Sequence, residues 1–445
     1  MLTKVMKPWR QLQVASLVLG MALSTSWAQA QQLMRWQTEQ GARVVFIESR
    51  NQPMLDVRVD FDAGYWRDSP QKAGVSALTL SLLQAGTTQY SEQVLAEKLA
   101  DQGARLSSSI ETERAGLQLR TLSSEPQRTA ALTLFRNILS NPSFPTAAVE
   151  REKKRTIEGL KQAETDAASV ADRLLTTAIY PTHPYGYDAL TSVTTVAGVR
   201  RADILAFWQQ HYQAAKATVT LVGDISQQEA KGIAQQLTQT LPRVATQQTT
   251  PNRVPTVATQ QLIKRPHPSS QVHIMLGMPL LQRHDPDYYP LLVGNYILGG
   301  GGFDSRLMRV LRDQHGLTYG VSSYMSPLRE AGPFVIQLAT QKKNADQANA
   351  LIDQVLAQFM QQGPTDEELA QAKNHLIGGF PLRLDNNRKL LDYAAVIGFY
   401  GLPDDFLSAY TQRIAAVSRE QIQQAFGRRV ASQQWQRVMV GVEPQ

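Results

Sequence analysis

Two halves of this 445-residue chain carry the same four kinds of segment in the same order. In each half a strand-like run precedes an apolar helix, a Pro-Thr pair then opens a second helix, and a β-rich run closes the half. The segments are 55–61, 74–86, 145–160 and 217–224 in the first half, and 271–276, 288–298, the helix after 364–365, and 437–441 in the second. The repeated order predicts a duplicated α+β domain rather than two unrelated domains.

The stretch 241–260 separates the two halves. Its sequence, LPRVATQQTTPNRVPTVATQ, is rich in Thr, Gln and Pro and lacks the spacing of an amphipathic helix. We therefore predict an N-terminal domain at 31–240, a linker at 241–260 and a C-terminal domain at 261–445. The length of the chain also favours two domains over one.

The first 30 residues have the pattern of a secretory signal peptide. Lys4, Lys7 and Arg10 precede an apolar run at 14–23, and Ala28-Gln29-Ala30 fits a small-x-small cleavage site. The run is shorter than the roughly 20 residues of a membrane-spanning helix, which argues against an anchor. We expect an exported protein, in the periplasm of a Gram-negative bacterium, whose mature chain begins near residue 31. The absence of cysteine agrees with this and excludes disulfides and thiolate metal ligands.

The net charge is too small to indicate a nucleic-acid partner. The value of +7 includes three cationic side chains in the N-terminal segment, so the mature chain carries about +4. No lysine- or arginine-rich tract with interleaved aromatic residues is present. We expect no nucleic acid among the partners, and no membrane once the signal peptide is removed.

The helix that follows Gly74 has the pattern of a buried helix without chemistry. Val75, Leu78 and Leu82 fall at i, i+3 and i+7, which is an apolar stripe of helical period. Ser69-Pro70 is typical of an N-cap with a proline in the first turn, and Gly86 is typical of a C-cap.

The frame of this helix, from Gly74 to Gly86-Thr87, resembles the first helix of the pitrilysin/insulinase family of inverted-motif zinc peptidases (inverzincins). Active members of that family carry His-x-x-Glu-His here. The resemblance places the first histidine on Ala77, the glutamate on Leu80 and the second histidine on Ser81. A methyl, an isobutyl and a hydroxymethyl group cannot bind zinc or take a proton from water. The resemblance therefore implies that this helix keeps the shape of its relatives and has lost the metal.

The third zinc ligand of active relatives comes from the charged helix at 149–160. The sequence pattern aligns that glutamate with Gly159, whereas the spacing from the second histidine favours Glu158. Both alignments remain open, and a single carboxylate is not a zinc site in either. The simplest interpretation of Glu158 is a solvated helix residue, and His183-Pro184-Tyr185-Gly186 matches a structural turn of the family rather than a ligand.

The histidines give no other metal motif, because no two of them lie at i, i+3 or i+4. They are His183, His211, His267, His273, His284, His315 and His375. We expect no metal and no other cofactor in this chain.

The segment from Gly299 to Tyr319 closely resembles the C-terminal domain of the same family. A phosphate-binding loop is excluded because the glycine run lacks the Gly-Lys-[Ser/Thr] ending, so the glycines are expected to permit a tight turn and a close backbone approach. The family pattern places on Arg312 and Tyr319 the two donors that hold the substrate carbonyl and stabilise the tetrahedral transition state. The alternative is a surface arginine and a half-buried strand tyrosine.

The resemblance extends from about residue 40 to 442 and implies two homologous α+β domains, each an antiparallel-rich sheet packed with helices, that face each other as a clamshell. In some bacterial relatives, as in the mitochondrial processing peptidase, one subunit carries zinc and its partner has lost the ligands. We therefore expect this chain to be inactive alone and to form a heterodimer with a zinc-binding paralogue, to which it supplies Arg312 and Tyr319 for the cleavage of unfolded peptides. The alternatives are a catalytically inert scaffold member of the family and, less favoured, a peptidase with a relocated metal.

Overall fold

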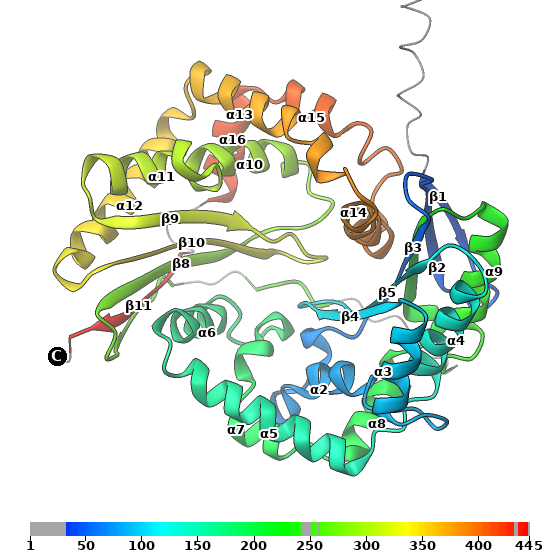
Figure 1. Cartoon of the computed structure of the whole chain (residues 1–445). Helices are drawn as coiled ribbons and strands as arrows, with labels where there is room; N and C mark the ends of the chain where they lie inside the picture. The colour runs from blue at the N-terminus through cyan, green and yellow to red at the C-terminus, as the bar shows by residue number, and fades with distance from the viewer. Residues whose placement is uncertain (1–32, 243–250, 256–258, 431–434, 444–445) are drawn as a thin grey trace, which may run out of the picture. The chain divides into compact units, whose positions relative to one another are not determined.

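The computed structural model describes residues 33–242, 251–255, 259–430 and 435–443. The predicted signal peptide and much of the predicted linker lie outside these residues. No helix in the described part is long and apolar enough to cross a membrane. The fold is a mixture of helices and two mixed sheets, as predicted (Figure 1).

The first sheet has six strands in the order β1-β2-β6-β3-β5-β4. Only the β2–β6 pair is parallel, and the other neighbours are antiparallel. The strands are β1 (Leu33–Gln37), β2 (Arg43–Glu48), β3 (Met54–Phe61), β4 (Arg105–Ile110), β5 (Ala115–Leu122) and β6 (Ala217–Gly223).

The second sheet has five strands in the order β7-β11-β8-β10-β9, with the β7–β11 pair parallel. The strands are β7 (Leu262–Pro266), β8 (Gln271–Leu281), β9 (Thr318–Met325), β10 (Gly332–Gln341) and β11 (Gln436–Val442). If β1 is left out, the strands of the first sheet, numbered along the chain, have the same spatial order as those of the second sheet. The parallel pair also has the same place in both sheets. The duplication expected from the sequence is therefore present in the topology.

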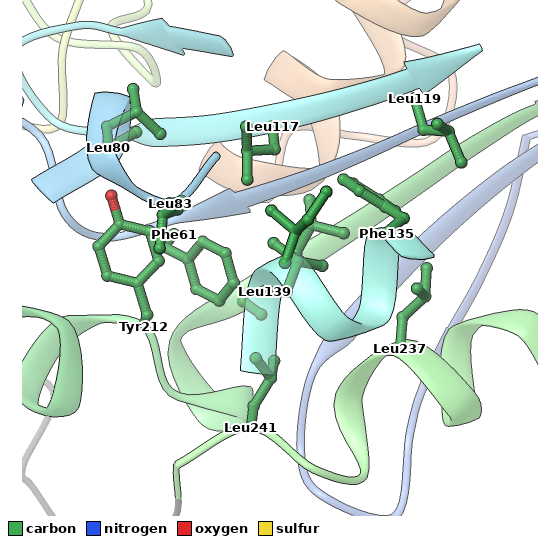
Figure 2. Close-up of a cluster of buried hydrophobic side chains, with 14 of the residues drawn as sticks. Phe61, Leu80, Leu83, Leu117, Leu119, Phe135, Leu139, Tyr212, Leu237 and Leu241 are labelled. Atoms are coloured by element: carbon green, nitrogen blue, oxygen red, sulfur yellow. The ribbon is translucent and has the colours of Figure 1, made fainter. Parts of the chain in front are cut away.

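The helices of the first half include the two that the sequence predicts after Gly74 and after Pro145-Thr146. They are α2 (Val75–Leu82), α3 (Glu92–Asp101), α4 (Gln127–Ser140), α5 (Thr146–Ala163), α6 (Ala167–Ile179), α7 (Val193–Ala197), α8 (Arg201–His211) and α9 (Gln227–Thr238). Except for α6, they surround a core in which Phe61 of β3 and Leu117 of β5 meet Phe135 and Leu139 of α4 (Figure 2). This core covers one face of the first sheet.

The second half contains α10 (Tyr288–Asn295), α11 (Arg306–Met308), α12 (Ala345–Gln362), α13 (Asp366–Gly378), α14 (Asn387–Tyr400), α15 (Tyr410–Ala416) and α16 (Arg419–Arg429). Two π-helical segments, η6 (Tyr296–Gly300) and η8 (Arg309–Gln314), extend α10 and α11. As predicted, the glycine run makes a close approach and a tight turn. A Cβ on Gly299 would lie 2.9 Å from the backbone nitrogen of Ser323, and Gly302 has a φ of +63°.

The opposite face of each sheet is covered by a helix from the other half. Helix α6 packs on β8 and β11, whereas α14 packs on β2, β3 and β6. The two contacts are tight: a Cβ on Gly277 of β8 would lie 2.5 Å from Ile179 of α6, and one on Gly398 of α14 would lie 2.6 Å from Val45 of β2. Because α6 and α14 follow α5 and α13 at equivalent places in the duplicated order, this exchange of helices is itself symmetric.

Strand β3 shows why both faces are covered. Its apolar residues alternate with Asp56, Arg58 and Asp60, and the apolar set faces the first core. The charged set is also buried, because Arg58 pairs with Asp60 at 2.8 Å and with Asp392 of α14 at 3.5 Å. The polar side of the strand is therefore an internal surface on which α14 rests.

The sequence prediction for the start of α2 was wrong in one respect. Ser69-Pro70 does not open this helix but precedes a separate 3-10 turn, η2 (Pro70–Lys72). Helix α2 begins after Gly74, which has a φ of +98°, and it ends at Leu82, before Gly86. The left-handed conformation of Gly74 breaks the chain between the two helices, which the apolar spacing could not show.

Replacement of Gly398 by alanine tests the contact between α14 and the first sheet. In an open helix this change stabilises by about 0.5–1 kcal/mol, but here the methyl group would meet Val45 and Thr218. We expect Gly398→Ala to lower the free energy of unfolding by about 1 kcal/mol or more, measured by urea denaturation.

The matched control for Gly398→Ala is Gly159→Ala in α5. No atom lies within 4 Å of a Cβ at Gly159, so this change should stabilise the protein. Equal shifts in the two variants would contradict the proposed tightness of the α14 contact.

Candidate functional site

The residues at the aligned zinc-site positions do not form a polar site. Ala77 and Ser81 lie one turn apart on the half-buried face of α2, and the Ser81 hydroxyl donates to the carbonyl of Leu78 at 3.2 Å. Leu80 is only 3% exposed and belongs to the first core with Leu83 and Leu117 (Figure 2). The position aligned with the catalytic glutamate is therefore part of the hydrophobic packing.

The third-ligand position offers nothing to complete a metal site. Glu158 and Gly159 are both exposed on α5, which agrees with the interpretation of Glu158 as a solvated residue. Among the described residues, no group of three or more His, Cys, Asp or Glu side chains is placed to hold a metal ion. Both alignments of the third ligand remain open.

Two of the histidines, His183 and His211, have structural roles. His183 donates from Nε2 to the carbonyl of Asn252 at 2.8 Å and accepts the backbone N–H of Tyr185 at Nδ1, so it fixes the predicted turn. His211 is buried against Phe207, and burial, with help from the cations of Lys216 and Arg67, lowers its pKa to about 3. A neutral, enclosed imidazole of this kind fits core packing.

Two carboxyl groups that were not identified from the sequence, those of Asp68 and Asp188, lie near the start of α2. Asp68 accepts the backbone N–H groups of Gly74 at 2.7 Å and Ser76 at 2.9 Å, so it supplies the helix cap that had been assigned to Ser69. Burial raises the pKa of Asp68 to about 7, although these two hydrogen bonds act in the opposite direction. Burial also raises the pKa of its neighbour Asp188 to about 6, and the N–H of Ala189 offsets this only in part.

Arg312 and Tyr319 both project from the second half toward solvent. Arg312 lies on η8 with about 40% of its side chain exposed, and Tyr319 lies on β9, an edge strand of the second sheet, with 91% exposed. Tyr319 is thus not the half-buried strand tyrosine of the alternative interpretation. No hydrogen bond within the described structure joins the two side chains or holds the Tyr319 hydroxyl, so both donors are available to a group outside this chain.

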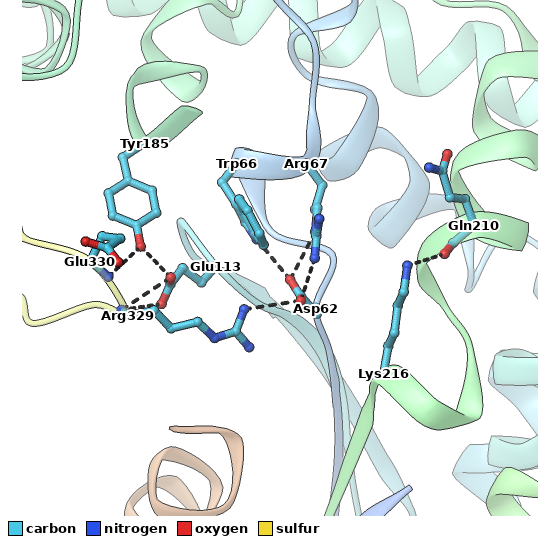
Figure 3. A network of polar contacts seen from close by, with 9 residues as sticks. All are labelled: Asp62, Trp66, Arg67, Glu113, Tyr185, Gln210, Lys216, Arg329 and Glu330. Carbon is cyan, nitrogen blue, oxygen red and sulfur yellow. Dashed lines mark hydrogen bonds and ion pairs between the residues drawn. The ribbon is translucent and has the colours of Figure 1, made fainter. Parts of the chain in front are cut away.

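A polar network ties the hairpin that carries Tyr319 to the first half (Figure 3). In the β9–β10 loop, the backbone N–H of Arg329 donates to the carboxylate of Glu113 at 3.1 Å, and the N–H of Glu330 donates to the Tyr185 hydroxyl at 3.0 Å. Tyr185 in turn donates to Glu113 at 2.5 Å. The Arg329 guanidinium also pairs with Asp62 at 3.2 Å. The edge strand β9 is therefore anchored at one end by residues of the first half.

Glu113 is fully buried at the centre of this network. Burial raises its pKa, while Arg329 and the surrounding donors limit the rise. No sequence motif marked Glu113, Tyr185 or Arg329 as a unit, because they come from three separate segments. Only the His183–Gly186 turn, which positions Tyr185, gave a signal in advance.

An open cavity of about 580 Å³ lies between α6 and the strands β8, β9 and β10. Its polar lining residues are Ser169 and Asp172 of α6, His273 of β8, Ser322 of β9 and Gln337 of β10. Burial raises the pKa of Asp172. The cavity adjoins the edge strand that carries Tyr319, and its lining was not predicted from the sequence.

Comparison with known proteins identifies the family that shares this fold. The family model described as insulinase (peptidase family M16) matches residues 43–191, and the one described as peptidase M16 inactive domain matches residues 198–376. A crystal structure of a peptidase M16 inactive domain from Pseudomonas fluorescens superposes with a TM-score of 0.89 at 30% identity, over 93% of this chain and 98% of that one. The chain belongs to the insulinase (M16) peptidase family.

Two curated relatives show that this family includes proteins described in opposite ways. The "non-peptidase homolog YmxG" of Helicobacter pylori is 24% identical over 85% of this chain and 87% of its own length. The "uncharacterized zinc protease YmxG" of Bacillus subtilis is 23% identical over 80% of this chain and 85% of its own length. Family membership alone therefore does not fix activity, and the residues at 77, 80 and 81 must decide it.

Replacement of Leu80 by glutamate tests how completely the catalytic position has become core. A carboxylate here would be buried without a partner, so Leu80→Glu should lower the free energy of unfolding by about 3 kcal/mol. The matched variant Ser81→Glu, on the half-buried face of the same helix, should lose much less. Urea denaturation measures both, and equal losses would show that Leu80 is not specially enclosed.

The raised pKa of Asp188 predicts a pH-dependent stability difference. The folded state holds this proton up to about pH 6, whereas the unfolded state releases it near pH 4, so Asp188 destabilises the folded chain as pH rises through this window. Asp188→Asn can still accept the N–H of Ala189. It should match the parent at pH 4 and be more stable by about 2 kcal/mol at pH 7.5.

Asp203→Asn is the control with the opposite sign. Partial burial raises the pKa of Asp203, but hydrogen bonds from Lys72 and the Arg200 backbone lower it by more, so its ionised form is the stabilising one. The deficit of Asp203→Asn should already be present at pH 4 and stay nearly constant up to pH 7.5, and it should shrink only as pH falls below about 4. Thermal unfolding from pH 4 to 7.5 measures both variants, and parallel profiles would contradict the sign given for Asp188.

Proposed function

We propose that this chain is the metal-free subunit of a periplasmic, heterodimeric zinc metallopeptidase that cleaves unfolded peptides. One observation carries the proposal: the chain has the fold of the family, yet Ala77, Leu80 and Ser81 offer no metal ligand while the side chains of Arg312 and Tyr319 are accessible to solvent. A retained pair of donors without a metal in the same chain fits a site that is completed by a second subunit. Zinc in that partner would activate the attacking water.

In this proposal Arg312 and Tyr319 act on the scissile carbonyl. The guanidinium carries a fixed positive charge and several N–H donors, and the phenol adds an O–H donor. Both can stabilise the negative charge that develops on the carbonyl oxygen when water adds to it. The unfolded peptide would pair as an added strand with a sheet edge of the zinc subunit, which presents its carbonyl in an extended conformation.

The periplasmic location is part of the proposal and rests on the N-terminal sequence pattern. The basic residues, the short apolar run and the small-x-small site at 28–30 support export. Peptides that enter or misfold in that compartment would be the available substrates.

The isolated chain should not hydrolyse a quenched unfolded peptide, even with added zinc. Mixed with a paralogue that carries an intact His-x-x-Glu-His helix, it should support turnover. Arg312→Ala should then lower kcat about 100-fold, because it removes a donor to the oxyanion. Arg309→Ala, which removes a neighbouring exposed arginine bound to Glu368, is the control and should change kcat little. Turnover by the chain alone would refute the proposal.

The second candidate is a catalytically inert scaffold, favoured by the match to an inactive-domain model and by the relative described as a non-peptidase homolog. It predicts that Arg312→Ala and Tyr319→Phe leave the rate of the mixed enzyme unchanged. The same assay therefore separates the two candidates.

A further inference from the structure

The exposed ring of Phe303 lies against the guanidinium of Arg312. The guanidinium carbon is 4.8 Å from the ring centroid, within the range of a cation–π interaction. Phe303 is 68% exposed, so its ring adds little to the core of the second half. The main partner that the structure gives this ring is therefore the arginine.

The backbone around Phe303 is fixed, so the ring has a defined position. Gly302 adopts a φ of +63°, and the Ser305 hydroxyl and backbone N–H both donate to its carbonyl, at 2.8 and 3.2 Å. The N–H of Gly301 donates to the carbonyl of Tyr296 at 2.7 Å, and a Cβ on Gly301 would lie 2.7 Å from that same oxygen. The glycine run thus does more than turn the chain, because it directs an aromatic ring to the side of η8.

The ion pair of Arg312 with Asp313 constrains the position of the guanidinium less than its contact with the Phe303 ring does. Nη1 of Arg312 lies 3.6 Å from the carboxylate of Asp313, and both side chains are about half exposed. Ion pairs of this kind are screened by salt and contribute little. A neighbouring carboxylate also neutralises the charge that an oxyanion would need, whereas a ring face leaves that charge intact.

We propose that Phe303 is a positioning residue for Arg312, which holds the guanidinium by its ring face in the orientation that reaches the substrate carbonyl. The inference rests on the proposed function, in which Arg312 contacts that carbonyl. Phe303 itself does not touch the reacting atoms. Its contribution is to reduce the number of rotamers that Arg312 samples before the peptide arrives.

The contact can be tested in the isolated chain by NMR of arginine side chains labelled with ¹⁵N. Protons over a ring face are shielded, so the Hε signal of Arg312, identified by its loss in Arg312→Lys, should lie upfield. Phe303→Leu keeps an apolar side chain without a π face and should return the signal to the position of a free arginine. Phe303→Tyr should restore the shift, and Asp313→Asn should leave it unchanged. The inference is overturned if the Hε signal of Arg312 stays upfield in Phe303→Leu, or if its upfield shift is lost in Asp313→Asn.

The catalytic consequence is tested in the mixture with the zinc-bearing paralogue. Phe303→Leu should lower kcat about two- to fivefold, as expected for an exposed cation–π contact, and Phe303→Tyr should restore it. In the Arg312→Ala background Phe303→Leu should have no further effect, because the residue acts only through Arg312.

The two proposals fail in different ways. If Arg312→Ala leaves the rate unchanged, the proposed function fails, and the positioning role fails with it. If Arg312→Ala is severe while Phe303→Leu is silent, only the positioning role is overturned. A Phe303→Leu variant with normal kcat at saturation but weaker association with the paralogue would also overturn it, since the ring would then be a partner contact.

Discussion

The exchange of α6 and α14 between the halves is the constraint on which the rest of the structure depends. Each sheet has its own helices on one face and a borrowed helix on part of the other, so β8 and β11 in one sheet and β2, β3 and β6 in the other are covered on both faces. Apolar strand residues such as Val45 and Met275 lie under the borrowed helix rather than under the helices of their own half. Glycine at 277 and at 398 allows the helix and sheet backbones to approach closely. The position of the second sheet, and of the edge strand with Tyr319, is therefore set by residues of the first half.

A second link between the halves is polar, and it lies beside the apolar cluster of α6, to which Tyr185 and Leu328 also belong. Glu113 collects donors from Tyr185 and from the β9–β10 loop, and Arg329 extends the same network to Asp62. A buried carboxylate is costly unless its oxygens are occupied, so these partners must arrive together for the arrangement to be stable. Apolar packing thus joins each sheet to a helix of the other half, while hydrogen bonding fixes one end of the β9–β10 hairpin. Together they hold β9 still while leaving its outer edge unpaired.

Much of the fold could be predicted from periodicity, because strands such as β3 and helices such as α5 carry their spacing in the sequence. The duplicated order of segments also predicted two sheets of equivalent topology. Periodicity identifies the apolar face of a helix but not which sheet that face covers. The exchange of α6 and α14 between the halves therefore could not be predicted from the sequence. Contacts distant in sequence, such as that of Glu113 with Arg329, had no local signal. Asp68 was missed because its hydrogen bonds span a glycine in a left-handed conformation. Arg312 and Tyr319 remain predictions that rest on a family pattern.

The burial of Leu80 makes one order of changes at the zinc-motif positions more costly than another. Ala77 and Ser81 lie on a half-buried face and could change with little effect on folding, but the position between them has been absorbed into the core. A lineage that regained the carboxylate before both histidines would carry an unpaired charge inside the protein, with no ion to hold it. That order of changes is therefore opposed by the low stability of its intermediate, whereas the order in which the histidines come first is not. Burial of the side chain at position 80 therefore opposes a return of the carboxylate ahead of its metal ligands.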